Sequence, residues 1–193
     1  MSHNSQIMRL LVAGFLFASP AFAEGDGPGP NLVIEVTGDA NGQIVIDMNA
    51  EGAPKHVAQI VALAKAGSYD NVVFHRVIDG FMAQTGDVQY GKKGGDTSMA
   101  GMGGSDMPDI PAEFSTSLPF ERGVVGMARS QDPDSANSQF FIMFAPGDFL
   151  DGQYTVVGKV IAGMDVVDQI KKGAGQNGEV TEPDVMAKVT VTE

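Results

Sequence analysis

The apolar residues of this chain fall mostly into short runs, and they follow a helical spacing in only two places. Two runs within residues 31–48 flank Asn41-Gly42, a dipeptide that strongly favours a tight turn between strands, so this segment predicts a hairpin. Further runs rich in Val, Ile and Phe predict strands at 72–78, 81–87, 123–130, 138–144, 154–161 and 185–192.

The two helical patterns are amphipathic. Residues 53–69 predict a helix with Pro54 in its first turn and Gly67 at its end. Its apolar residues recur at helical spacing, at Val57, Ile60, Val61 and Ala64. Residues 163–172 predict the second helix.

Many short strands with only two helices favour a mainly β fold, an antiparallel barrel or sandwich, over an alternating parallel α/β fold. The chain has 193 residues and no internal repeat, which suits one domain. Residues 91–104 contain six glycines without periodicity, so they predict a long surface loop.

The N-terminus resembles a targeting segment rather than part of the fold. Residues 1–23 contain Arg9, then the apolar run Leu10 to Phe17, then Ala21-Phe22-Ala23. This order predicts a secretory signal peptide cleaved after Ala23, since the apolar run is too short for a membrane anchor. Residues 24–30 then form a flexible leader, and residues 31–193 form the domain. We therefore expect a periplasmic protein, or one released outside the cell, with no membrane attachment after cleavage.

Composition excludes several kinds of site. The net charge of −12 would repel phosphate backbones, which argues against a nucleic-acid partner. The absence of cysteine excludes disulfides, a thiol nucleophile and a cysteine-based zinc site. His56 and His75, the two histidines after the signal peptide, cannot form a three-ligand zinc centre by themselves, so we expect no metal and no cofactor. His75 is interpreted as a structural strand residue with its hydrogen bonds satisfied.

Two further segments match known binding motifs in part, but their surroundings or their key residues exclude the corresponding sites. Residues 173–178, GAGQNG, match a dinucleotide-binding pattern, but they follow a predicted helix and precede a strand, which reverses the required order. Residues 132–137, DPDSAN, start like a calcium loop but have Asn137 where the essential glycine belongs. Both are interpreted as loops.

What remains are polar donors inside apolar strands: Arg76, Gln84, Arg129 and Gln139. No nucleophile and no acid–base pair accompanies them. Such a set suits a site that works by binding and polarisation.

Four segments together, FHRVIDGFMAQTGD, GVVGMARS, NSQFFIMF and FLDGQYTVVGKV, resemble the cyclophilin family of peptidyl-prolyl cis–trans isomerases. The resemblance extends in order from about Val33 to Val191. It implies an eight-stranded antiparallel barrel capped by two α-helices, with the active groove on the outer face. It also implies rotation about X-Pro bonds in unfolded or partly folded polypeptides.

The resemblance assigns roles by motif. Arg76 matches the family's catalytic arginine, and Gln84 matches the amide that holds the substrate's backbone carbonyl. Arg129 is expected to contact substrate through its backbone. The walls of the proline pocket are expected at Phe81, Met82, Phe141 and Leu150. The remaining groove positions are Ala128, Arg129, Ser130 and Gln139.

Two positions depart from the best-known eukaryotic members and are similar to bacterial ones. Phe149 stands where those proteins have Trp, and Tyr154 where they have His. Loss of the indole N–H removes a donor at the rim of the groove, so weak or no cyclosporin binding is expected. Neither position supplies the catalytic charge. An alternative hypothesis is a chaperone that binds proline peptides in the same groove without needing turnover.

Overall fold

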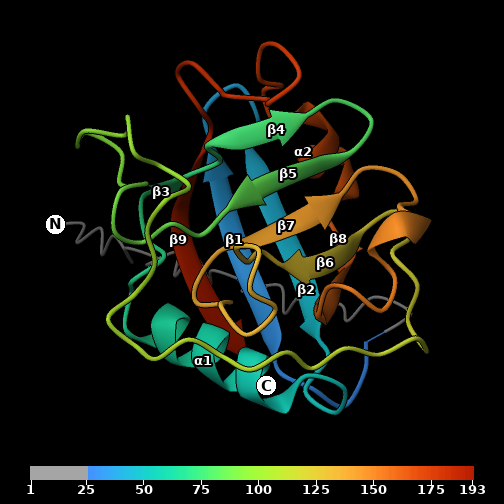
Figure 1. Cartoon of the computed structure of the whole chain (residues 1–193). Coiled ribbons are helices and arrows are strands. Elements are labelled where there is room, and N and C mark those ends of the chain that lie inside the picture. Colours follow the sequence, from blue (N-terminus) through green and yellow to red (C-terminus); the bar gives the residue numbers. More distant parts are fainter. Residues whose placement is uncertain (1–25) are drawn as a thin grey trace, which may run out of the picture.

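Nine antiparallel strands form a single sheet that curls into a barrel (Figure 1). The computed structural model describes residues 26–193. Its strands are β1 (Asn31–Thr37), β2 (Gly42–Met48), β3 (Val72–Val73), β4 (Arg76–Ile78), β5 (Met82–Thr85), β6 (Val124–Met127), β7 (Phe140–Met143), β8 (Val156–Ala162) and β9 (Val185–Thr192). The helices are α1 (Pro54–Lys65) and α2 (Met164–Gln169), with a short 3-10 turn, η1, at Asp148–Leu150. The mainly β, two-helix class predicted from the sequence is confirmed.

The sheet order is β3-β9-β1-β2-β8-β6-β7-β5-β4. Its two edge strands, β3 and β4, are separated in sequence by only Phe74 and His75, so the chain itself joins one edge to the other. The segment 72–78, predicted as one strand, is therefore two. The interruption arises because β3 pairs with β9 whereas β4 pairs with β5, and the chain must change partners between them.

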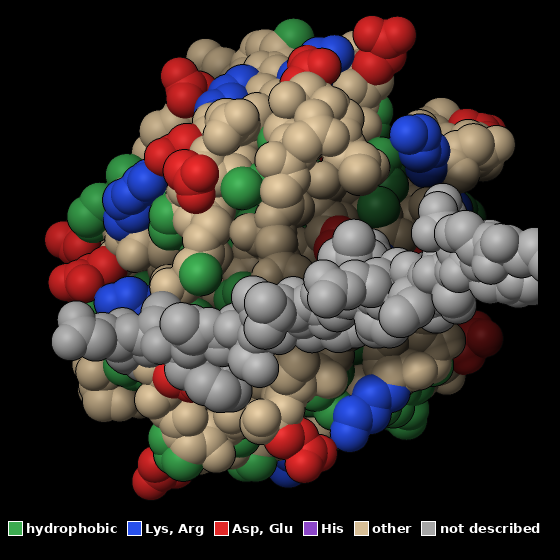
Figure 2. Space-filling view, turned by 180° about the vertical axis from the view of Figure 1, so that it is seen from behind, with side chains coloured by type: hydrophobic (Ala, Val, Ile, Leu, Met, Phe, Trp, Pro, Cys, Tyr) green, Lys and Arg blue, Asp and Glu red, His purple; other side chains and the backbone are tan. Residues whose placement is uncertain are grey.

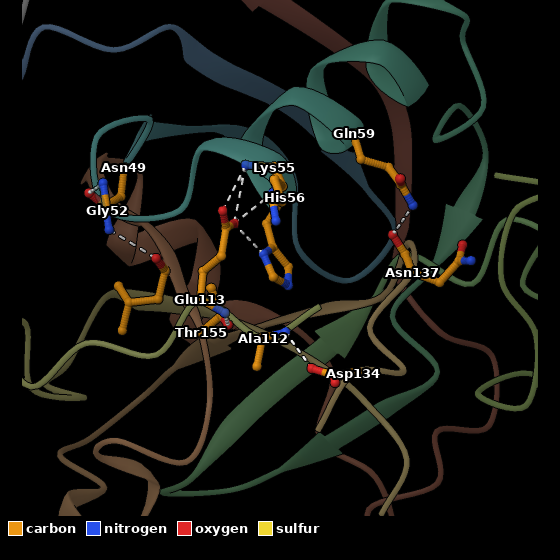
Figure 3. Close-up of polar contacts among 11 residues, drawn as sticks. Asn49, Gly52, Lys55, His56, Gln59, Ala112, Glu113, Asp134, Asn137 and Thr155 are labelled. Atoms are coloured by element: carbon orange, nitrogen blue, oxygen red, sulfur yellow. Dashed lines mark hydrogen bonds and ion pairs between the residues drawn. The ribbon is translucent and has the colours of Figure 1, made fainter. Parts of the chain in front are cut away.

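Helix α1 lies across one end of the barrel in Figure 1, and its apolar face is buried. Pro54 occupies its first turn and Gly67, at φ +71°, follows its end, as the sequence predicted. No neighbouring side chain caps its N-terminus. Instead the carboxylate of Glu113, from a distant loop, accepts the backbone N–H groups of Lys55 and His56 and contacts His56 Nδ1 at 2.6 Å (Figure 3).

The buried apolar residues form two separate clusters. The larger cluster fills the barrel and includes the inner faces of β1, β2 and α1. The smaller cluster lies around β5, β6 and β7 and consists of Met82, Phe120, Val124, Phe141, Met143, Leu150 and Val156. Several residues expected to form the proline pocket therefore also belong to a packed cluster, which holds their side chains in place.

The predicted signal peptide, residues 1–23, lies outside the described residues. Of the predicted leader, residues 26–30 make defined contacts: Gly27 N–H donates to Asp47, and the Pro30 carbonyl accepts from Met48 N–H. Within residues 26–193, no helix has the length and apolar content needed to cross a membrane. Asp and Glu side chains are spread over the face seen in Figure 2, in keeping with the acidic composition.

Candidate active site

Cross-strand pairing brings the predicted polar and aromatic residues into one row. Arg76 on β4 is opposite Gln84 on β5, and Gln84 is opposite Phe141 on β7. Phe141 in turn is opposite Gly126 on β6, and these four strands lie side by side in Figure 1. Because residues directly opposite in a sheet point to the same face, residues more than 60 positions apart in sequence share one surface.

Gly126 makes room for this row. A Cβ atom at position 126 would lie 2.4 Å from the ring of Phe141 and 2.6 Å from that of Phe120. The rings of Phe120 and Phe141 stack with centroids 5.8 Å apart, directly over the glycine. A side chain here would displace Phe141, which we expect to form a wall of the proline pocket.

A cavity of about 390 Å³ opens on this surface. Its lining includes Arg76 and most of the other residues that the resemblance singled out: Phe81, Met82, Gln84, Ala128, Arg129, Phe141, Phe149, Leu150 and Tyr154. Gln153 also lines it and was not predicted from the sequence. The two remaining predicted residues, Ser130 and Gln139, line a neighbouring cavity of about 310 Å³, which shares Gln84, Ala128 and Arg129 with the first.

Arg76 is half-buried and held at three points. Its Nε donates to the Asn177 carbonyl at 3.0 Å, its Nη1 donates to Gln84 Oε1 at 3.2 Å, and Met82 Sδ lies 3.9 Å from Nη1. Among residues 26–193, no hydrogen bond uses its Nη2, and no carboxylate forms an ion pair with it. The guanidinium therefore presents a full positive charge and spare N–H groups to the cavity.

Asn177 belongs to the GAGQNG segment that failed as a dinucleotide motif. That segment covers the outer edge of β4: Val77 N–H donates to the Gly178 carbonyl, and Gly173 N–H donates to the Val77 carbonyl. The segment is a loop, as predicted, but its contact with Arg76 was not predicted. A contact made by a backbone carbonyl has no signature in side-chain types.

The walls of the first cavity are aromatic and packed. Phe81 and Phe149 approach with centroids 5.5 Å apart, and Phe141 meets Tyr154 edge-on at 5.9 Å. Met82 and Leu150 are buried beneath them, whereas Phe149 is 65% exposed at the rim. This arrangement offers an apolar notch open on one side.

Two glutamines form a directed hydrogen-bond chain beside Arg76. Gln84 Nε2 donates to Gln139 Oε1 at 2.9 Å, and Gln139 Nε2 donates to the carbonyls of Gly101 and Gly103 at 3.0 and 2.8 Å. Arg can only donate and a carbonyl can only accept, so both amide orientations are fixed. The second N–H of the Gln84 amide has no acceptor among residues 26–193, so it can donate to a ligand.

Backbone carbonyls and the Tyr154 ring hold the Arg129 side chain. Its guanidinium donates to the carbonyls of Gln153 and Ser130 and lies 4.4 Å above the ring centroid of Tyr154. The hydrogen bonds of residues 26–193 include none to the Arg129 backbone N–H or carbonyl. The backbone is thus free to pair with an extended peptide, which is the contact the sequence resemblance implied.

His75 is buried, as expected of a structural residue, but the prediction that its hydrogen bonds are satisfied is wrong. Among the described residues, neither ring nitrogen has a partner. Burial lowers the pKa of His75 from its usual 6.5 to about 4, with the Arg76 charge adding to the effect and Asp87 opposing it. The imidazole is therefore neutral near pH 7.

Comparison with known proteins identifies relatives over most of the chain. Residues 32–191 match the family model described as cyclophilin type peptidyl-prolyl cis-trans isomerase. A probable peptidyl-prolyl cis-trans isomerase of Brucella suis is 60% identical over 154 residues, covering 78% of each chain. Peptidyl-prolyl cis-trans isomerase B of Escherichia coli is 38% identical over 166 residues, covering 79% of this chain and 96% of its own.

Solved structures agree on the fold. The cyclophilin AquaCyp293 of Hirschia baltica superposes with a TM-score of 0.69 at 27% identity, covering 86% of this chain and 74% of its own. A cyclophilin-type isomerase of Cryptosporidium parvum, solved in the presence of the dipeptide Ala-Pro, gives a TM-score of 0.71 at 24% identity. It covers 84% of this chain and 99% of its own.

Proposed function

This chain belongs to the cyclophilin-type peptidyl-prolyl cis-trans isomerase family, and on that premise we propose that Arg76 drives the isomerisation by donating a hydrogen bond to the prolyl nitrogen of the twisted peptide bond. The observation that carries this proposal is the position of Arg76: a guanidinium without a carboxylate partner in residues 26–193, lining an apolar cavity.

The chemistry makes this role effective. Rotation about a peptide bond meets a barrier of about 18–20 kcal/mol because resonance must be lost. In the twisted state the prolyl nitrogen carries a localised lone pair, which can accept a hydrogen bond that the planar ground state cannot. A donor aimed at that lone pair stabilises the transition state more than the substrate, which is the requirement for catalysis.

The other residues hold the substrate while the bond rotates. Phe81, Met82 and Phe141 surround the pyrrolidine ring, and the free N–H of Gln84 binds a backbone carbonyl of the substrate. The unpaired backbone of Arg129 pairs with the peptide on the other side. The scheme needs no cofactor and no proton transfer, so activity is expected to change little between about pH 6 and 8.

The substrates we propose are unfolded or partly folded proteins containing X-Pro bonds, met in the periplasm after export. A relative solved with Ala-Pro supports a proline-sized ligand for the groove. Cyclosporin is expected to bind weakly or not at all, because Phe149 at the rim has no N–H to donate.

A proline-peptide isomerisation assay on the wild type and on Arg76→Ala tests the proposal. We expect the wild type to turn over and Arg76→Ala to lose most of the activity. Equal activity of the two proteins would remove Arg76 from the mechanism. Binding of proline peptides without turnover by either protein would favour the chaperone alternative.

A further inference from the structure

A buried carboxylate, Asp87, organises the loop next to the active groove. Asp87 lies two residues after the end of β5 and is fully buried. Its Oδ1 accepts the backbone N–H groups of Gln89 and Tyr90, at 3.0 and 2.9 Å. Its Oδ2 accepts those of Gly101 and Gly103, at 2.7 and 2.9 Å. One side chain thereby ties both ends of the glycine-rich loop to the end of β5.

The same two glycines are held from the opposite side by the active groove. The carbonyls of Gly101 and Gly103 accept both N–H groups of the Gln139 side chain. Gln139 then accepts from Gln84, and Gln84 accepts from Arg76. The Asp87 carboxylate and the Arg76 guanidinium are therefore connected by hydrogen bonds on either side of Gly101 and Gly103, joined through the backbone of these two glycines, and each hydrogen bond has one possible direction.

The loop has little freedom to shift. A Cβ atom at Gly103 would lie 2.7 Å from Asp87 Oδ1 and 2.7 Å from the ring of Tyr90. Gly101 has φ +100°, and a Cβ atom there would lie 3.2 Å from the His75 ring. Because neither glycine has a side chain, the loop backbone can pack directly against Asp87 and His75. In this position the carbonyls of Gly101 and Gly103 face Gln139.

We propose that Asp87 is a positioning residue for the isomerase reaction: by fixing the peptide units of Gly101 and Gly103, it sets the orientation of Gln139 and Gln84 and so the place of the Arg76 guanidinium. This inference rests on the proposed role of Arg76. Without Asp87 the two carbonyls lose their fixed direction, and Gln139 can rotate away from Gln84. Arg76 then keeps its charge but loses one of the contacts that aim it.

Asp87→Asn is the direct test, because the amide keeps the shape but cannot accept on both sides. A displacement of about 1 Å can cost up to about 10²-fold in rate, and for a partial loosening we expect kcat to fall about 10-fold with KM changed less than about 3-fold. Asp184→Asn is the matched control. Asp184 is equally buried and also accepts two backbone N–H groups, from Ala40 and Lys171, but lines neither cavity.

A double-mutant cycle separates positioning from general loss of stability. In the Arg76→Ala background there is no guanidinium to aim, so Asp87→Asn is expected to lower the residual activity less than about 2-fold. The Arg76 Nε–H resonance in an NMR spectrum should shift or broaden in Asp87→Asn and stay in place in Asp184→Asn. If Asp87→Asn does not fold, Gly103→Ala replaces it. The new methyl group would collide with the Asp87 carboxylate and push it away from the loop backbone.

The proposal is overturned if Asp87→Asn lowers kcat by the same factor in the wild type and in Arg76→Ala. It is overturned as well if the Arg76 Nε–H resonance is unchanged in Asp87→Asn. It is also overturned if Asp184→Asn has the same effects. Full activity of Arg76→Ala by itself would instead refute the proposed mechanism of Arg76, so the two failures are distinguishable.

Discussion

His75 and Arg76 are adjacent in sequence, yet their side chains lie in different environments. Arg76 faces the cavity with its charge available, whereas His75 is buried and neutral. The sequence predicted a structural role for His75, and the sequence resemblance assigned the catalytic role to Arg76. The missing hydrogen bonds of His75 could not be foreseen, because they depend on how closely Gly101 covers the ring.

The buried histidine predicts a pH dependence of stability. With a folded pKa of about 4 against 6.5, the unfolded chain binds a proton first as the pH falls, so stability is lost between about pH 6.5 and 4. Between pH 7.5 and 5.5 we expect a loss of about 1 kcal/mol, measured by urea unfolding, that is absent in His75→Leu. An equal loss in both proteins would assign the effect to other groups.

At the scale of elements, the strands and helices could be predicted, but the contacts that the loops make with the site could not. Strand and helix positions follow from periodicity, and all the predicted segments contain the expected element. The segments 91–104 and 173–178 were predicted only as loops, yet they supply the backbone carbonyls of Gly101, Gly103 and Asn177 to the site. Every residue has a backbone carbonyl, so the sequence does not reveal which carbonyls accept hydrogen bonds from site residues.

Helix α1 depends on a distant residue for its N-terminus. Glu113 accepts two backbone N–H groups and contacts buried His56, so Glu113→Gln is expected to lower the free energy of unfolding by about 2 kcal/mol (Figure 3). Glu35→Gln, on an exposed strand position, is the control and should change it by less than about 0.5 kcal/mol. Similar values for the two variants in thermal or urea unfolding would refute this role of Glu113.

Glu113 also adds an acid limit to stability. Burial by itself would raise its pKa, but the hydrogen bonds from His56 and Lys55 outweigh burial, and the pKa lies below its usual 4.5. A lowered pKa means that the contribution is complete above pH 4.5 and is lost as the pH falls through the folded value. The Glu113→Gln difference from wild type should therefore shrink as the pH falls below 4.5 and through the lowered pKa of Glu113.

At the scale of the whole molecule, the curled sheet brings distant segments of the chain together on one outer face. An apolar cavity can be stable at this surface because Met82, Phe141 and Leu150 in its walls belong to the second apolar cluster. The number of strands predicted a barrel or a sandwich, and the sequence resemblance specified the barrel. The split of segment 72–78 into β3 and β4 was not predicted, because it depends on which strands lie at the two edges of the complete sheet.

Export is also a whole-molecule property, and the sequence predicts that the mature chain starts at Glu24. Expression in a Gram-negative host with N-terminal sequencing of the periplasmic fraction is expected to find Glu24 first. Replacing Ala21 and Ala23 by bulky residues should leave the uncleaved precursor in the membrane fraction. A cytoplasmic product that retains Met1 would contradict the prediction.

The central claim is that the Arg76 guanidinium acts on the transition state. The most direct test measures kcat for a bound X-Pro peptide by NMR exchange, together with the peptide's Kd, for wild type, Arg76→Ala and the control Arg129→Ala. A contribution of about 3–4 kcal/mol predicts that Arg76→Ala lowers kcat by roughly 10²–10³ while Kd changes by less than about 5-fold. Arg129→Ala should keep kcat within about 3-fold of wild type. An Arg76→Ala protein with unchanged kcat, or one whose loss lies entirely in Kd, would contradict the account.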